Sequence, residues 1–323
     1  MAGSESLIAR TEHSAVSGGN KCRRQPDSVA PTPSRTAYPT PMLTHRPETP
    51  GLFITGTSTE IGKTVVSALI ADQLRRFEAE EAPRSRIGVC KPIATGCRKE
   101  RGGLVAEDAE TLAHAADFNP EIGDLTTVAP IRFREPVAPA VALQLKRGGP
   151  ARRGDNVPIP WDVVDTALER LDDHCSYLIV EGIGGVMVPL EGPGRAMHVK
   201  DFPSTVLDMI VAIGYPAVVV ADAALGTLNH TALTITALRS RGIRVAGVVL
   251  NRFRPGVDDV AMQTNPVWIP AQCKAPILAV IPDGEHTPNI EPFDVRQIHP
   301  AYREAIDATD FRGLCKPAAA VRS

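Results

Sequence analysis

Short apolar runs alternate with longer amphipathic stretches from Gly51 onward. The runs are rich in β-branched residues at successive positions, which is typical of strands covered on both faces of a parallel sheet. They lie at residues 51–55, 87–90, 127–131, 177–180, 217–221, 245–250 and 277–281. The amphipathic stretches predict helices at residues 63–77, 108–116, 161–172, 206–213 and 229–241. The alternation predicts one doubly wound α/β domain over residues 51–285, with a mostly parallel sheet of about seven strands and helices on both faces.

The two ends of the chain lack this pattern. Residues 1–50 contain seven prolines, six serines and six threonines, but few large apolar residues. Such a segment buries too little surface to offset the entropy lost on ordering. We expect a disordered extension here, with a transit peptide or a mis-assigned start codon as alternatives. Residues 286–323 are expected to form a tail, in which residues 302–310 could form one short helix.

The strongest motif connects the first predicted strand to the first predicted helix. It reads Gly56-Thr-Ser-Thr-Glu-Ile-Gly62-Lys63-Thr64. The backbone N–H groups of such a loop cradle phosphate oxygens, while the lysine reaches the terminal phosphates and the hydroxyl ligates Mg²⁺. Its first glycine stands one position earlier than in the strict pattern. The motif nevertheless predicts a nucleotide site in a fold of the P-loop NTPase type.

Charged residues follow two other predicted strands. Lys91 comes directly after the run 87–90, and Glu181 directly after the run 177–180. Because ligands of parallel sheets lie at the carboxyl ends of the strands, both side chains are expected beside the phosphate loop. Lys91 would neutralise charge on a transferred phosphoryl group, and Glu181 would bind a metal. Asp108, at the start of a helix, is expected to be a further oxygen ligand beside Thr64 and Glu181.

Two more loops could contact ligands. Residues 226–231 open a helix whose free N–H groups could hold a carboxylate. Asn251 ends the run 245–250, where its side-chain amide could pair with the edge of a nucleotide base.

Composition excludes several function classes. The net charge is −2, and no block of Lys and Arg indicates a nucleic-acid partner. The six cysteines form no CxxC pair, which favours reduced thiols in the cytoplasm. No stretch approaches the roughly 18 apolar residues that a membrane span needs.

In this order, the motifs resemble the dethiobiotin synthetase family. The family loop Gly-Thr-Asp-Thr-Glu-Val-Gly-Lys-Thr is similar to Gly56–Thr64, and its Lys-Pro-Val-Ala-Ser-Gly is similar to Lys91–Gly96. Its Glu-Gly-Ala-Gly-Gly resembles Glu181–Gly185, and its Gly-x-x-Asn-His resembles Gly226–His230. Order and spacing agree from about residue 51 to residue 283.

The resemblance implies an ATP-dependent cyclo-ligase that builds the ureido ring of dethiobiotin from 7,8-diaminononanoate and CO₂. It further implies a homodimer, Mg²⁺ held by Thr64, Asp108 and Glu181, and catalytic roles for Lys63 and Lys91. The implied nucleotide-binding residues are Glu60, Ile61, Gly62, Lys63, Thr64, Val65, Asp108, Glu181, Gly182, Ile183, Gly184, Asn251, Arg252, Ile281, Pro282 and Asp283. The implied substrate-binding residues are Thr59, Thr95, Gly226, Thr227 and Asn229.

Three departures from the family pattern leave alternatives open. Ser58 replaces the usual Asp, Ile183 replaces Ala, and the two terminal segments have no counterpart. The loss of the carboxylate at Ser58 keeps open a regulatory module that binds nucleotide without catalysis. An ATP-dependent amide ligase is a further alternative, although too few residues follow Pro282 for the glutamine-hydrolysing domain of those enzymes. A partition-type ATPase would carry a lysine where this chain has Thr57 or Ser58.

Overall fold

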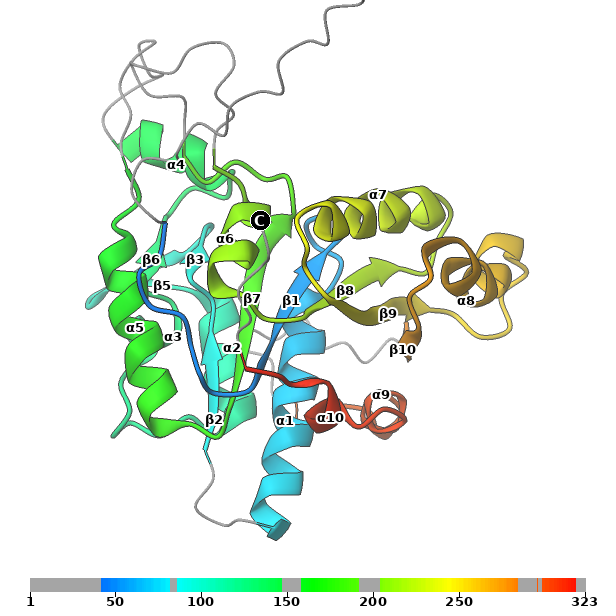
Figure 1. Ribbon diagram of the computed structural model, residues 1–323, viewed down its shortest axis with the longest axis horizontal. Helices are drawn as coiled ribbons and strands as arrows, with labels where there is room; N and C mark the ends of the chain where they lie inside the picture. The colour runs from blue at the N-terminus through cyan, green and yellow to red at the C-terminus, as the bar shows by residue number, and fades with distance from the viewer. Residues whose placement is uncertain are drawn as a thin grey trace, which may run out of the picture. The chain divides into compact units, whose positions relative to one another are not determined.

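A parallel sheet with helices on both faces forms the centre of the molecule. The computed structural model describes residues 42–81, 86–146, 158–191, 204–283, 295 and 298–317, all within the compact unit Thr40–Ser323. The six main strands lie in the order β10-β9-β8-β1-β7-β2 (Figure 1). Their bounds are β1 Gly51–Gly56, β2 Ile87–Cys90, β7 Tyr177–Gly185, β8 Ala217–Asp222, β9 Val245–Phe253 and β10 Ile277–Pro282. All neighbouring pairs are parallel, and the predicted fold class is confirmed.

Two small sheets and a set of helices complete the domain. The parallel pair is β3 Ile93–Ala94 with β6 Ile131–Arg132, and the antiparallel pair is β4 Arg98–Glu100 with β5 Gly103–Val105. The described helices are α1 Lys63–Glu81, α2 Glu107–Ala116, α3 Leu125–Val128, α4 Pro139–Lys146, α5 Trp161–His174, α6 Val206–Ile213, α7 Thr227–Ser240, α8 Val260–Cys273, α9 Pro300–Asp307 and α10 Phe311–Leu314. None of them combines the length and the apolar character that crossing a membrane requires.

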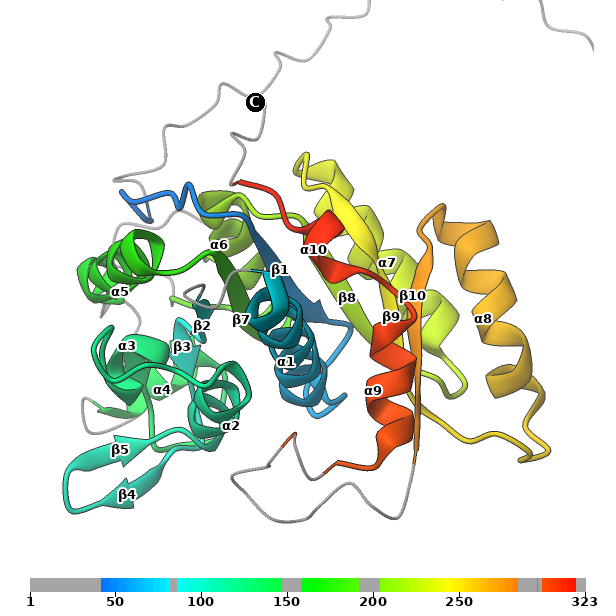
Figure 2. The same ribbon diagram turned by 90° about the horizontal axis from the view of Figure 1, so that it is seen from below.

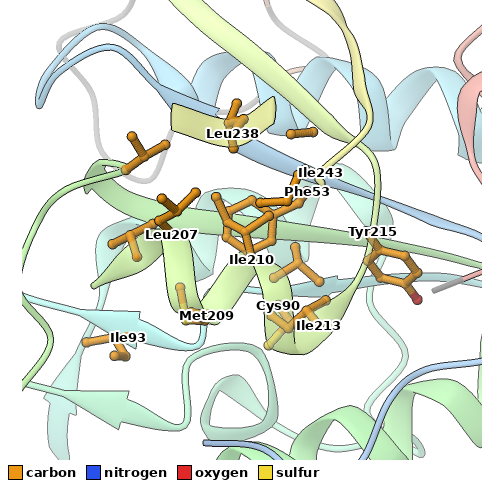
Figure 3. Packing of buried hydrophobic residues seen from close by; sticks show 14 of the residues in the cluster. Phe53, Cys90, Ile93, Leu207, Met209, Ile210, Ile213, Tyr215, Leu238 and Ile243 are labelled. Atoms are coloured by element: carbon orange, nitrogen blue, oxygen red, sulfur yellow. The ribbon is translucent and has the colours of Figure 1, made fainter. Parts of the chain in front are cut away.

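The sheet separates two hydrophobic cores, because successive side chains of a strand point to opposite faces. Phe53 of β1 packs into the core shared with α5, α6, α7 and α8. Its neighbours Leu52 and Ile54 pack into the core shared with α1, α2, α9 and α10. Figure 2 shows α1, α9 and α10 on one side of the sheet and α6 and α7 on the other. Figure 3 shows the Phe53 ring beside Ile210 of α6.

The strand order brings the predicted site residues to one edge of the sheet. β1 lies between β7 and β8, and β2 pairs with the far side of β7. The carboxyl ends of β1, β7 and β2 therefore lie next to one another. The ends of β1 and β2 lead into the phosphate loop and Lys91. Glu181, expected to follow its strand, lies within β7 and pairs with Ile54 of β1, because the strand continues to Gly185.

One predicted strand is wrong. Residues 127–131 were expected to form a strand, but Leu125–Val128 form the short helix α3 and only Ile131–Arg132 are extended. Asp124 explains the difference, because its side chain accepts a hydrogen bond from Thr126 N at 2.7 Å and caps the helix. Helix α8 was not predicted, because Pro266 and Pro270 interrupt its helical pattern.

The expected N-terminal extension is too long. Residues 1–41 lie outside the described residues, whereas residues 42–50 pack along α5. Thr44 donates from both N and Oγ1 to the buried Asp165 carboxylate. Glu48 N and Thr49 N donate to Asp172 at 2.9 and 2.7 Å. These polar side chains of α5 hold a segment whose own composition predicts no structure.

The expected C-terminal tail is in part a component of the domain. The buried residues Tyr302, Ile306 and Phe311 join the core on the α1 side of the sheet. Gln73 Nε2 of α1 donates to Ile306 O at 3.1 Å and to Thr309 O at 2.9 Å. The predicted helix at residues 302–310 corresponds to α9, which begins two residues earlier at Pro300.

Replacing Asp172 with Ala is expected to lower the free energy of unfolding by about 1 to 3 kcal/mol, since hydrogen bonds to a charged acceptor are lost. Burial opposes ionisation of Asp172, but the backbone donors of Glu48 and Thr49 hold its pKa below the ordinary value. The stabilisation is therefore present above a pH of about 4 and is lost as the pH falls further.

Urea denaturation at several pH values measures this effect. Asp173→Ala is the matched control, because Asp173 is exposed on the same helix turn. Equal losses for Asp172→Ala and Asp173→Ala at neutral pH would contradict the packing of residues 42–50 described above.

Candidate functional site

The loop between β1 and α1 has a backbone that only certain residues adopt. Gly62 has a φ of +83°, and a Cβ at this position would lie 2.1 Å from Nδ2 of Asn251. Asn251 Nδ2 donates to Ile61 O at 2.8 Å, and Arg252 donates to Glu60 O. The end of β9 thus holds two successive carbonyls of the loop. The sequence predicts that Asn251 pairs with a nucleotide base, and it contains no signal for the contact with Ile61 O.

Four side chains from four elements meet beside the loop. Thr64 opens α1, Lys91 follows β2, Asp108 lies in the first turn of α2, and Glu181 lies on β7. Thr64 Oγ1 lies 2.9 Å from Asp108 Oδ1 and 2.9 Å from Glu181 Oε1. Lys91 Nζ donates to Glu181 Oε1 at 2.8 Å and also to Asp108 Oδ2. The structure therefore brings together four residues that lie far apart in the sequence.

Burial and charge act against each other in this cluster. Glu181 is fully buried and Lys91 is 5 % exposed. Burial disfavours the ammonium form of Lys91, but the facing carboxylates of Glu181 and Asp108 raise its pKa above the ordinary value. Burial likewise opposes ionisation of Asp108, but the charge and hydrogen bond of Lys91 keep its pKa below the ordinary value. The ammonium of Lys91 and the carboxylate of Asp108 therefore stabilise each other as ions.

The second lysine of the site has a different environment. Lys63 is 7 % exposed, and its Nζ donates to the backbone carbonyl of Ser58 at 3.0 Å. Burial lowers the pKa of Lys63, and together with the positive charge of Lys91 it outweighs the carboxylates of Glu181 and Asp108, which act in the opposite direction. Because the ammonium of Lys63 is paired only with a neutral carbonyl of the phosphate loop, it is available to an anion that binds in the loop.

The oxygen atoms of the cluster suit a hard cation. Among the described residues, no group of three or more His, Cys, Asp or Glu side chains could hold a metal ion. Two carboxylates and one hydroxyl remain, which matches the few protein ligands that Mg²⁺ takes when phosphates and water supply the others. Glu181 Oε2 is buried and has no hydrogen-bond partner, so an acceptor atom is left for a cation.

The other predicted nucleotide-binding residues form two separate groups. Val65 follows Thr64 in α1, while Gly182, Ile183 and Gly184 continue β7 beyond Glu181. Ile281, Pro282 and Asp283 lie at the end of β10, which β9 and β8 separate from β1.

The predicted substrate-binding residues come from three segments. Thr59 lies exposed in the phosphate loop, and Thr95 is half-buried just after β3. Gly226 precedes α7, whose first turn contains the buried Thr227 and the exposed Asn229. Since β8 leads into α7 and pairs with β1, this helix start lies at the same edge of the sheet as the phosphate loop.

Comparison with known proteins identifies the family. The model of a family described as "AAA domain" matches residues 50–290. The ATP-dependent dethiobiotin synthetase of Thermodesulfovibrio yellowstonii is 34 % identical over 232 residues, which cover 72 % of this chain and 88 % of that protein. The corresponding protein of Saccharopolyspora erythraea is 38 % identical over 233 residues, which cover 72 % and 87 %.

The chain belongs to the ATP-dependent dethiobiotin synthetase family. The resemblance drawn from the motifs is thereby confirmed, and membership of this family makes the chain an ATP-dependent ligase. Among solved structures, a ParA family ATPase from Chlorobium tepidum is similar with a TM-score of 0.46 and 12 % identity, over 80 % of this chain and 96 % of that chain.

Membership of the family does not remove the departure at Ser58. The side chain of Ser58 is exposed, and only its backbone carbonyl contacts Lys63. The contacts among Thr64, Lys91, Asp108 and Glu181 are made without the side chain at position 58.

Replacing Gly62 with Ala is expected to lower affinity for ATP by at least about tenfold, because the new Cβ would meet Asn251 Nδ2 and the backbone would be strained. Isothermal titration with ATP measures the change. Gly102→Ala is the control, because no atom lies within 4 Å of a Cβ built there. Unchanged affinity in Gly62→Ala would show that the loop has another conformation.

Proposed function

We propose that the chain is an ATP-dependent dethiobiotin synthetase, which closes the ureido ring of dethiobiotin from 7,8-diaminononanoate and CO₂ and releases ADP and phosphate. The sequence relatives of the same name support this activity. The observation that carries the proposal is the contact of Lys91 with both Asp108 and Glu181 beside the phosphate loop. It supplies charges of both signs at the place where a triphosphate would lie.

The reaction that we propose needs little covalent chemistry from the protein. One amine of the substrate combines with CO₂ to form a carbamate. A carbamate oxygen then attacks the γ-phosphorus of ATP, which gives a carbamic–phosphoric anhydride and ADP. The second amine attacks the carbamate carbon, closes the ring and releases phosphate. Positioning and charge stabilisation are the main demands, and no side-chain nucleophile is required.

Lys63 and Lys91 are proposed to stabilise the negative charge of the transferred group. Each is largely buried, and removal from water strengthens the attraction between an ammonium and a phosphoryl oxygen. Thr64, Asp108 and Glu181 are proposed to hold Mg²⁺, which would neutralise phosphate charge when bound. The unpartnered Oε2 of Glu181 supports this role.

The proposed base and substrate contacts follow from the remaining geometry. Asn251 donates its Nδ2 to Ile61 O, which leaves Oδ1 to accept from the exocyclic amine of adenine. The free N–H groups at the start of α7, from Gly226 to Asn229, are proposed to hold the substrate carboxylate. Thr59 and Thr95 are proposed to contact the diamine.

A homodimer in the cytoplasm is part of the proposal. Leu225 and Leu233 are 87 % and 62 % exposed, and they flank the proposed substrate residues at the start of α7. Large exposed apolar side chains beside a ligand site are typical of an interface. The described cysteines, all of them free and buried, support a reducing compartment.

An assay with diaminononanoate, bicarbonate and MgATP tests the activity. Purified protein is expected to form dethiobiotin and ADP in equal amounts. Binding of ATP without any cyclic urea would instead favour the regulatory module that Ser58 keeps open.

Replacing Lys91 with Ala is expected to reduce kcat by about 10² to 10³, which is typical when one charge-stabilising donor is removed from an active site. Lys99→Ala provides the control, since Lys99 is an exposed lysine on β4. Steady-state kinetics of both variants measure the difference. Full activity of Lys91→Ala would exclude this residue from the reaction.

A further inference from the structure

Lys91 makes the contacts that a bound cation would make. Its ammonium lies against Asp108 Oδ2 and Glu181 Oε1, and Thr64 Oγ1 contacts Asp108 Oδ1 and the same oxygen of Glu181. These three oxygen-bearing side chains are the proposed ligands of Mg²⁺. The chain thus presents its own positive charge to the group that is proposed to bind a metal.

An ammonium is needed at this place for a physical reason. Two neighbouring carboxylates repel each other, and an uncompensated buried charge is strongly destabilising. This cost applies to Glu181, because its side chain is fully buried. Lys91 donates a hydrogen bond to each carboxylate, whereas Lys63 acts on them through its charge alone and donates to the carbonyl of Ser58.

The ammonium and a divalent cation would compete for the same two carboxylates. Mg²⁺ binds its ligands at about 2.1 Å and requires near-octahedral geometry. Glu181 Oε1 already accepts from Lys91 and lies next to Thr64. A cation bound to Oε1 or to the unpartnered Oε2 of this carboxylate would lie close to the ammonium, and the two positive charges would repel each other.

We propose that Lys91 is an internal counter-ion that a divalent cation displaces from Asp108 and Glu181. This inference rests on the magnesium site of the proposed function, but not on the identity of the organic substrate. Displacement turns the ammonium toward the incoming anions, so that Lys91 becomes available to the phosphoryl group when the metal is bound. Metal affinity and the position of Lys91 are then linked, and each changes the other by the same factor.

The backbone around Lys91 confines the movement to the side chain. Lys91 N donates to Val128 O at 2.7 Å, and Pro92 O accepts from Ile131 N at 3.2 Å. Pro92 also fixes its own φ. The main chain is therefore held on both sides of the lysine, and rotation about the side-chain torsions is enough for the ammonium to leave the carboxylates.

Binding of Mn²⁺ to the full chain in the absence of nucleotide tests the proposal. Electron paramagnetic resonance measures free Mn²⁺, and Mg²⁺ is then used to compete it off. Lys91→Met removes the competing ammonium and is expected to raise Mn²⁺ affinity by at least about tenfold, a coupling of ordinary size for linked sites. Lys63→Met is the matched control, because it removes an equal charge that contacts neither carboxylate, and a change of less than about threefold is expected from its weaker long-range repulsion.

Two results would overturn the proposal. Lys91→Met could bind Mn²⁺ no more tightly than the unaltered chain, which would mean that the ammonium does not compete. Alternatively, Lys63→Met could raise the affinity as much as Lys91→Met does, which would assign the effect to general charge.

A measurement on the unaltered chain covers the case in which Lys91→Met does not fold. Lysine labelled with ¹³C at Cε gives a signal for Lys91, which is identified by its absence from the Lys91→Met or Lys91→Arg variant. Addition of Mg²⁺ alone is expected to shift this signal, while the signal of the exposed Lys99 stays in place. A Lys91 signal that does not move at saturating Mg²⁺ would also overturn the proposal.

The outcome is separate from that of the dethiobiotin assay. If the chain forms no dethiobiotin but Lys91→Met binds Mn²⁺ more tightly, the counter-ion proposal stands and the proposed substrate is wrong. If the chain forms dethiobiotin but Lys91→Met binds Mn²⁺ no more tightly, the proposed substrate stands and the counter-ion proposal is wrong.

Discussion

The contact of the buried Lys91 ammonium with the buried carboxylate of Glu181 and the half-exposed carboxylate of Asp108 is the interaction on which the site depends. Lys91, Asp108 and Glu181 come from segments that meet only in the folded chain, and Thr64 links both carboxylates to the start of α1. The charge of Lys91 or of Glu181 would be destabilising alone, because both side chains are buried. Together they fix the relative positions of β2, β7, α1 and α2, and they concentrate charge beside the phosphate loop. The same residues that stabilise the fold locally are those that phosphoryl transfer would use.

The parallel sheet makes this arrangement possible. β1, β7 and β2 are neighbours, so Glu181 within β7 and the residues that follow β1 and β2 lie within reach of one another without long loops. The strands on the other flank of β1 contribute in another way. Asn251 and Arg252, at the end of β9, hold the carbonyls of Ile61 and Glu60 and thereby shape the loop that receives the phosphates. Site geometry is therefore set from both flanks of β1.

Much of the fold and of the central cluster could be predicted from the sequence. The strands that were predicted correctly are continuous apolar runs, and Lys91 and Glu181 directly follow two of them, so that the topology alone brings them together. Features that depend on tertiary contacts were missed. Residues 42–50 are held by Asp165 and Asp172 of α5, which nothing in the segment itself indicates. The α3 helix depends on the Asp124 cap within an apolar stretch, and the contact of Asn251 with Ile61 follows from a backbone geometry that sequence patterns do not encode.

The central claim is that Thr64, Asp108 and Glu181 form the metal site of a dethiobiotin synthetase, with Lys91 directed at the transferred phosphoryl group. A crystal structure of the chain with MgADP and 7,8-diaminononanoate tests it most directly. The account predicts Mg²⁺ at about 2.1 Å from an oxygen of each of the three residues, with both substrate amines next to Lys91. A metal bound elsewhere, or a diamine outside the pocket that Lys91 lines, would contradict it.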